Sequence, residues 1–330
     1  MCFKNFFFHK INVDRFLLKL RKTVYKNKLV IVALMGVYIL WGATYLAIKV
    51  LSYHVPLVFM SSIRHIISGL LLFLFGIIFK HPLPSKNQIK NTCIVGFFLL
   101  VVGNALVLYS NYFIHTSGVV AVLVATTPLW LAIIEWIFNK NKKPSKQIWL
   151  GVFLGLLGIV TLSHNDNLPT LGSSSIVGIL LILTGTLSWS IGIFISKISE
   201  MPASPFYSSG LQMVFSSFLL GLISLTFENW EEIKFEELNI YAWFSFIYLV
   251  FGGSVMGFTA FTYLTQKANP IIVGTYAYVN PIIALLIGII LGKEVISKLT
   301  LIASIILILA TILLLTPEEY ILLKTNKKAK

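Results

Sequence analysis

The sequence predicts an all-α polytopic membrane protein with ten transmembrane helices, arranged as two inverted five-helix repeats. Of the 330 residues, 57% are hydrophobic and only 12% are charged, whereas a soluble domain carries about 25% charged residues. Long apolar runs recur along the chain, and residues 30–163 resemble residues 174–316. Together these observations favour helices packed in a bilayer over a soluble globular domain.

Ten apolar runs are long enough to cross a bilayer core about 30 Å thick, which takes roughly 20 residues per helix. The runs are continuously apolar instead of alternating, so they predict helices and not the strands of a barrel. They cover residues 30–50, 57–79, 92–112, 117–138, 146–163, 174–197, 204–227, 240–265, 270–291 and 297–316. Glycine, serine and threonine inside them fit helices that pack on one another.

The net charge of +14 reports membrane topology, because Lys and Arg lie mostly in short loops and the two tails. Their distribution predicts a cytoplasmic basic segment at 1–29, a cytoplasmic basic tail at 317–330, and both termini inside. Within the first segment, apolar residues at helical spacing predict an amphipathic helix on the inner leaflet and not a signal peptide. The acidic loop 228–239 is expected to be a solvated turn or a short surface helix.

Several function classes find no support in the residues. The basic charge follows the membrane loops, so nucleic acid is not an expected partner. The two cysteines, Cys2 and Cys93, offer no disulfide framework or metal site, and we expect neither a metal nor a cofactor. A GxxxxGK[ST] nucleotide loop and an HExxH motif are both absent from the sequence. We therefore expect neither a nucleotide-driven pump nor an intramembrane enzyme.

An internal repeat relates the two halves of the chain. Trp41 and Lys49 align with Trp189 and Lys197, and Pro128 aligns with Pro281. Each half contains five predicted helices, so the second half must enter the membrane upside down relative to the first. Inverted repeats of this kind are typical of transporters, because two such halves can open one central site to either side.

Several segments also resemble a known family. They are "YILWGATYLAIK", "SSIRHIISGLLL", "VVGNALVLYS", "SGVVAVLVATTPLW", "GGSVMGFTAFTYL" and "TYAYVNPIIALLIGIILGKEVIS", and they span residues from about 30 to 316. The chain is similar to the EamA branch of the drug/metabolite transporter superfamily. This resemblance implies ten helices around a central cavity in a bacterial inner membrane, and export of amino acids, related metabolites or toxic compounds.

The chain departs from that family at one motif. The fourth and ninth helices of the family often end in a Leu-Gly-Glu turn. The second half has a related "LGKEVIS" with Glu294, but the first half reads "IFNKNKKPS". The resemblance therefore does not imply a role that needs this glutamate in both halves.

The first run carries polar and aromatic residues on one helical face. Tyr38, Trp41, Tyr45 and Lys49 fall at spacings of three, seven and eleven residues from the first. We expect Tyr38, Trp41 and Tyr45 to line a substrate cavity. The alternative is that the aromatic residues only pack and that Lys49 extends to the outer surface.

Arg64 is the strongest single polar signal in an apolar run, about eight residues from its outer end. A charge at a helix centre costs about 2.5–3.5 kcal/mol on insertion scales, so it should face a partner or water. The resembling family carries an arginine here, and it could hold a substrate carboxylate or lock the outer gate. Bonding to backbone carbonyls of a neighbouring helix is the structural alternative. Asn104 in the third run is a further cavity candidate.

The second half offers Trp189, Tyr276 and Asn280 as cavity candidates. Pro128 and Pro281 remove backbone donors inside apolar runs, which predicts helix interruptions at the transport centre. A kink that only shapes packing is the alternative. Glu135 lies near the cytoplasmic end of its run, where a salt bridge is favoured over a role in proton coupling, so the coupling mode stays open.

The prediction is therefore a secondary transporter that exports small metabolites such as amino acids or drug-like compounds by alternating access. An uncoupled channel-like facilitator or a lipid-carrier flippase on the same fold is the alternative. Its expected partners are a small-molecule substrate and the lipid bilayer. A homodimer is compatible with the sequence, but a monomer would suffice.

Overall fold

The computed structural model describes residues 28–113, 120, 123–138, 144–163, 173–230, 238–292 and 298–315. These residues form helices, and no strand occurs among them. The predicted amphipathic helix, the C-terminal tail, Glu294 and most of the acidic loop lie outside the described residues, as do the side chains of Tyr45 and Lys49. The all-helical part of the predicted fold class is therefore confirmed.

The first half of the chain folds into five helical segments, three of which begin or end beside residues outside the described ranges. These are α2 (Lys28–Leu51), α3 (Leu57–Ile78), a continuous helix made of α4 (Lys86–Gly96), η1 (Phe97–Asn104), α5 (Ala105–Tyr109) and η2 (Ser110–Tyr112), then α7 (Thr127–Phe138) and α8 (Lys146–Ser163). Local sequence sets several ends. Ser85 and Gln88 form a capping box at the start of α4, and Lys80 follows α3 with a positive φ of 53°.

The second half repeats this order. It contains α9 (Ser173–Ile198), α10 (Pro205–Phe227), a continuous helix of α11 (Ile240–Tyr248), η5 (Leu249–Phe258) and α12 (Thr259–Lys267), then α13 (Pro270–Gly274), α14 (Tyr276–Gly292) and α15 (Lys298–Leu315). The segments η1 and η5 are both π-helical. They occupy equivalent positions, in the middle of the third helix of each half.

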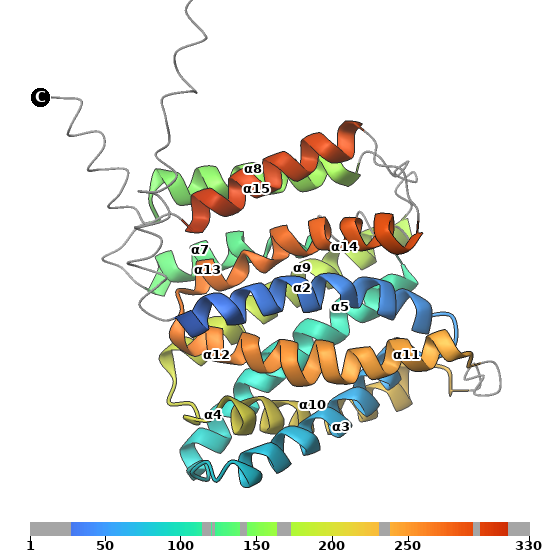
Figure 1. The fold of residues 1–330 in the computed structure, drawn as a ribbon, viewed down its shortest axis with the longest axis vertical. Helices are drawn as coiled ribbons and strands as arrows, with labels where there is room; N and C mark the ends of the chain where they lie inside the picture. The colour runs from blue at the N-terminus through green and yellow to red at the C-terminus, as the bar shows by residue number, and fades with distance from the viewer. Residues whose placement is uncertain are drawn as a thin grey trace, which may run out of the picture.

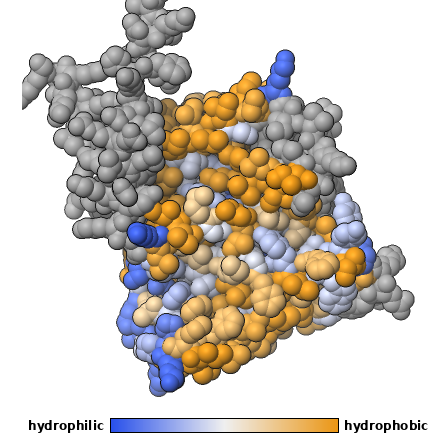
Figure 2. Space-filling view, in the orientation of Figure 1, coloured by the Kyte–Doolittle hydropathy of each residue, from blue (hydrophilic) through white to orange (hydrophobic). Residues whose placement is uncertain are grey.

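Six helices in the described part of the chain are long and apolar enough to cross a membrane, and four further apolar helices are shorter, at 10–17 residues. A crossing count of ten therefore stays a prediction. Large apolar side chains lie exposed on the outside of the bundle, including Leu70, Phe153, Phe218 and Leu301. Figure 2 shows apolar residues over much of one face, with the most hydrophilic residues at its edges. Such a surface suits lipid and not water.

The two halves pack with twofold pseudosymmetry. Figure 1 shows α8 and α15 paired at one edge of the bundle and α3 and α10 paired at the opposite edge. Equivalent helices of the two halves also make equivalent contacts: α2 packs on η5 and α14, while α9 packs on η1 and α7. Gly151 faces Leu314 and Gly158 faces Leu307, so the equivalent helices α8 and α15 run antiparallel. The second half is therefore inverted relative to the first.

Glycines allow the closest approach between the equivalent helices α3 and α10. A Cβ atom built on Gly69 would lie 2.9 Å from the Val214 backbone nitrogen and 3.0 Å from the Gly210 carbonyl oxygen. Gly210 in turn faces the Gly69 carbonyl oxygen at 3.0 Å. Only glycine fits such a backbone-to-backbone contact, so this crossing fixes how the two halves meet.

Glu228 joins the two halves at the end of the bundle where α3 begins. Its carboxylate accepts hydrogen bonds from the backbone N–H groups of Val58 and Phe59 at 2.9 and 2.8 Å, and from the Tyr112 hydroxyl at 3.1 Å. Pro56, at the N-cap of α3, supplies no side-chain cap. A residue from the acidic loop thus caps a helix of the other half, a role that the prediction of a solvated turn did not include.

Replacing Glu228 with alanine should lower the thermal stability of the purified protein, because the start of α3 loses its cap and a favourable charge. We expect a loss of about 1–2 kcal/mol, read as a lower melting temperature in detergent. Glu200, which bonds Gln88 at an exposed site, provides the control as Glu200→Ala. Equal melting temperatures for the two variants would contradict the capping role.

Candidate functional site

A cavity of about 190 Å³ lies between the two halves, in the part of the bundle that holds the connection between α2 and α3. Equivalent elements of both halves border it, namely α2 with α9, α3 with α10, η1 with η5 and α7 with α14. The other end of the bundle is filled by a packed apolar core that includes Leu34, Val37, Phe261, Leu264 and Ile271. The cavity is therefore blind toward the end at which α2 begins.

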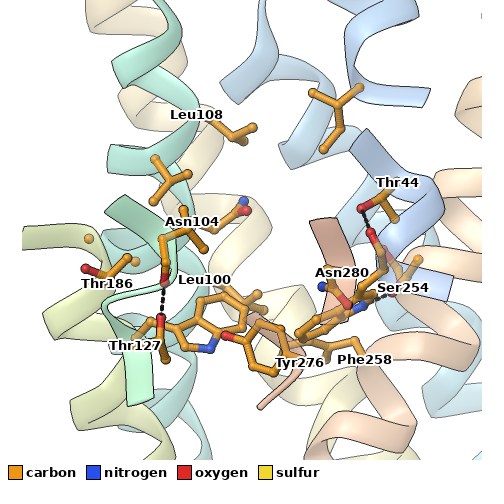
Figure 3. Close-up of a pocket in the computed structure, with 18 of the residues that line it drawn as sticks. Thr44, Leu100, Asn104, Leu108, Thr127, Thr186, Ser254, Phe258, Tyr276 and Asn280 are labelled. Carbon is orange, nitrogen blue, oxygen red and sulfur yellow. Dashed lines mark hydrogen bonds between the residues drawn. The ribbon is translucent and has the colours of Figure 1, made fainter. Parts of the chain in front are cut away.

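The structure brings most of the predicted cavity residues together. The members that line the cavity are Trp41, Arg64, Asn104, Trp189, Tyr276 and Asn280. Tyr38 is buried beneath it and does not line it, and Tyr45 has no described side chain. Figure 3 shows Asn104, Thr127 and Thr186 on one side and Thr44, Ser254 and Asn280 on the other, with Tyr276 and Phe258 below.

Four aromatic rings close the bottom of the cavity. The Trp41 ring packs against Trp189, Phe261 and Tyr276 at centroid distances of 5.9, 4.8 and 5.1 Å. Trp41 Nε1 donates to the Gly253 carbonyl oxygen at 3.0 Å. Trp189 Nε1 is buried and has no hydrogen-bond partner. The equivalent tryptophans of the two halves thus meet on the pseudosymmetry axis, where edge-to-face packing holds them in place.

A polar network surrounds Arg64 on the cavity wall. Its Nη2 atom donates to Ser61 Oγ at 3.4 Å and to His65 Nε2 at 3.1 Å. A guanidinium only donates, so His65 Nε2 is the acceptor, and the neutral imidazole donates from Nδ1 to Ser216 Oγ at 3.3 Å. Asn104 Nδ2 also donates to Ser61 Oγ, at 3.0 Å. Arg64 Nε is buried without a partner.

The structure interrupts a helix beside Pro128, at the turn 125–126, but not at Pro281. Pro281 lies inside α14, and the turn that separates α13 from α14 falls at Thr275. The Thr275 hydroxyl donates to the Ile272 carbonyl oxygen and accepts from the Tyr38 hydroxyl at 2.5 Å, which satisfies polar groups at the turn. Pro128 lies in the first turn of α7, where its missing donor costs little.

Sequence reasoning missed other polar residues that line the cavity. They are Thr44, His65, Thr186 and Ser254. His65 follows Arg64 directly, and a second ionisable residue in an apolar run was an available signal. The serine and threonine residues gave no such signal, because these residue types also occur wherever membrane helices pack. Glu135 is half-buried in α7 and does not line the cavity.

The described residues contain no group of three or more His, Cys, Asp or Glu side chains that could hold a metal ion. The described lining residues offer one guanidinium, several neutral hydrogen-bonding groups and an aromatic floor. An apolar pocket with a few convergent polar groups is the usual form of a small-molecule site.

Inverted halves, an apolar exterior and a polar cavity between the halves define a membrane transporter. The comparisons with known proteins agree. The chain belongs to the EamA-like transporter family, whose model matches residues 28–164 and again 176–316.

Among its relatives is the "Uncharacterized inner membrane transporter YedA" of Escherichia coli strain K12. It is 31% identical over 285 residues, which cover 85% of this chain and 89% of the relative. The "Uncharacterized transporter YoaV" of Bacillus subtilis strain 168 is 26% identical over 200 residues, which cover 60% of this chain and 68% of the relative. A solved structure described as "Crystal structure of protein" matches with a TM-score of 0.70 at 14% identity. The match covers 86% of this chain and 96% of the solved chain. That structural likeness concerns the fold alone.

Proposed function

We propose that this chain is a secondary transporter of the bacterial inner membrane that exports small metabolites, such as amino acids or drug-like compounds, by alternating access. The single observation that carries this proposal is the blind cavity bordered by equivalent elements of both inverted halves. Two similar halves of opposite direction can exchange conformations and so open the same site to the other side. The inner membrane location follows the name of the relative YedA.

The pseudosymmetry suggests what opens in the opposite state. In the packed end of the bundle, polar side chains from α9, α10 and α12 lie buried side by side. Ser196 and Thr265 share a hydrogen bond of 2.9 Å, and Gln212 donates to Ser208 at 3.3 Å. Gln212 Oε1 and Thr262 Oγ1 are buried without partners. Water or substrate would satisfy these groups if this end opened and the cavity now present closed.

Within this proposal the cavity residues are substrate contacts. Trp41, Trp189 and Tyr276 form the floor, and Arg64, Asn104 and Asn280 form the polar walls. Tyr38 supports the floor from below through Thr275, and Tyr45 stays a predicted contact. One chain supplies the whole cavity, so a monomer suffices for transport and a homodimer is not required.

The orientation that we propose places ten crossings in the membrane and both termini in the cytoplasm. Figure 1 shows α2 beginning and α15 ending at the same end of the bundle. An alkaline phosphatase fusion at the C-terminus should therefore be inactive and a fluorescent-protein fusion bright. The same pair fused after α2 provides the control and should give the reverse pattern. Phosphatase activity at the C-terminus would overturn the proposed topology.

A growth screen tests the function directly. Cells that overproduce the protein are grown on toxic amino acids, their analogues and drug-like compounds, and efflux of each protective compound is then measured in proteoliposomes. Export predicts protection and counterflow that saturates with substrate. Flux that never saturates would favour a channel-like facilitator, and flux of lipid-linked compounds alone would favour a flippase.

A further inference from the structure

We propose that the cavity binds a small organic anion, whose carboxylate pairs with Arg64 and whose apolar body rests on the aromatic floor. This inference rests on the proposed transport function and narrows its substrate class. It predicts that a carboxylate is required for binding and that an ammonium group on the same molecule is not.

The charge of the cavity is the first argument. Arg64 is the only fixed charge among the described lining residues, because His65 accepts from the guanidinium and is neutral in that arrangement. Among the described lining residues, none carries a carboxylate, and the hydrogen bonds of Arg64 go only to neutral groups. A cation in a low-dielectric site without a counter-ion is costly, so an anionic ligand would compensate it.

The hydrogen-bonding capacity of the wall is the second argument. Ser61 is fully buried, and its oxygen accepts from both Arg64 and Asn104. Arg64 Nε is buried without a partner. Hydrogen-bond donors therefore outnumber acceptors on the cavity wall around Ser61 and Arg64. A carboxylate offers acceptors only and suits such a wall.

The size of the cavity and the aromatic floor define the rest of the ligand. The volume is about 190 Å³, somewhat larger than a cavity of about 150 Å³ that holds benzene. The ligand is therefore about the size of a single-ring or branched aliphatic carboxylate. Trp41 packs edge to face against Trp189 and Tyr276, and Phe261 packs edge to face against Tyr276 and at a tilt against both tryptophans. They offer an apolar floor, not the open aromatic cage that binds an ammonium group.

Matched triplets of ligands test the proposal on the full-length protein in detergent. One triplet is 3-phenylpropanoate, 2-phenylethylamine and phenylalanine; the other is 4-methylpentanoate, 3-methylbutylamine and leucine. Quenching of tryptophan fluorescence gives the dissociation constants, since Trp41 and Trp189 line the cavity. We expect the carboxylate-only member of at least one triplet to bind tenfold or more tightly than the amine, and more tightly than the amino acid.

Variants assign the preference to the guanidinium. Arg64→Gln should weaken carboxylate binding at least tenfold without weakening amine binding, and Arg64→Lys should restore part of the loss. Lys197→Gln, at an exposed lysine remote from the cavity, should change neither. An unchanged melting temperature shows that a variant is folded, and Arg64→Lys serves if Arg64→Gln does not fold.

The outcomes separate this inference from the proposed function. Tightest binding of an amine or an amino acid in both triplets, or no binding of either carboxylate, overturns the substrate class. Efflux of another compound in the growth screen would then leave the transport function intact. Carboxylate binding without flux in proteoliposomes would instead support the substrate class and overturn the transport function.

Discussion

Arg64→Ala is expected to reduce substrate flux at least tenfold while the protein still inserts into the membrane. The guanidinium is the only fixed charge that the described residues place on the cavity wall. A hydrogen bond to a charged group contributes about 1.5–3 kcal/mol, which corresponds to roughly a 10- to 100-fold change in an equilibrium constant. The measurement is flux of a compound identified by the growth screen, in proteoliposomes normalised for the amount of protein.

The control for this experiment is Lys197→Ala, which removes a positive charge that bonds the Gln266 carbonyl oxygen at the exposed end of α9. Its flux should equal that of the unmodified protein. Normal flux through Arg64→Ala would remove the arginine from the site and leave it a structural role within α3, where it bonds Ser61 and His65.

Gly69→Leu should prevent the two halves from packing. The new side chain would begin 2.9 Å from a backbone nitrogen and 3.0 Å from a backbone oxygen of α10, and neither atom can move without shifting that helix. Overpacking usually costs 1–3 kcal/mol, and we expect about 3 kcal/mol because backbone atoms are involved. Thermal unfolding in detergent should show a melting temperature lower by roughly 5–10 °C, or no folded protein.

Gly36→Leu is the matched control, because a Cβ atom at Gly36 would meet nothing within 4 Å. Both positions lie inside helices of the first half, so the loss of glycine flexibility is the same in each. A melting temperature for Gly69→Leu close to that of Gly36→Leu would show that α3 and α10 do not depend on this contact.

The sequence predicted the helices well where apolar runs have clear ends. The run 57–79 became α3 (Leu57–Ile78) and the run 204–227 became α10 (Pro205–Phe227), because Pro56 and Pro205 mark both starts. The run 270–291 was predicted as one helix, but it divides at Thr275. Tertiary contacts decide this division, since the Tyr38 hydroxyl that bonds Thr275 comes from a distant helix.

The site was predictable to the extent that its residues are unusual in lipid. Trp41, Arg64 and Asn104 stand out in apolar runs, and the structure places all three on one cavity. Ser254 and Thr186 do not stand out, because the same residues elsewhere only pack. The sequence also could not predict which end of the bundle contains the cavity. The same sequence encodes the residues at both ends of the pathway, and only one end is open in a given conformation.

We expect the paired π-helical segments η1 and η5 to let each cavity wall rotate without breaking its helix. A π turn holds one residue more than an α turn, so conversion of η1 or η5 to α geometry would turn the residues beyond it by about 100°. Labelling of cysteines placed at Asn104 and Ser254, with and without a transported compound, would detect this rotation. The two π-helical segments, one in each half, would then let the helices rotate and turn polar groups away from the site while both helices stay continuous.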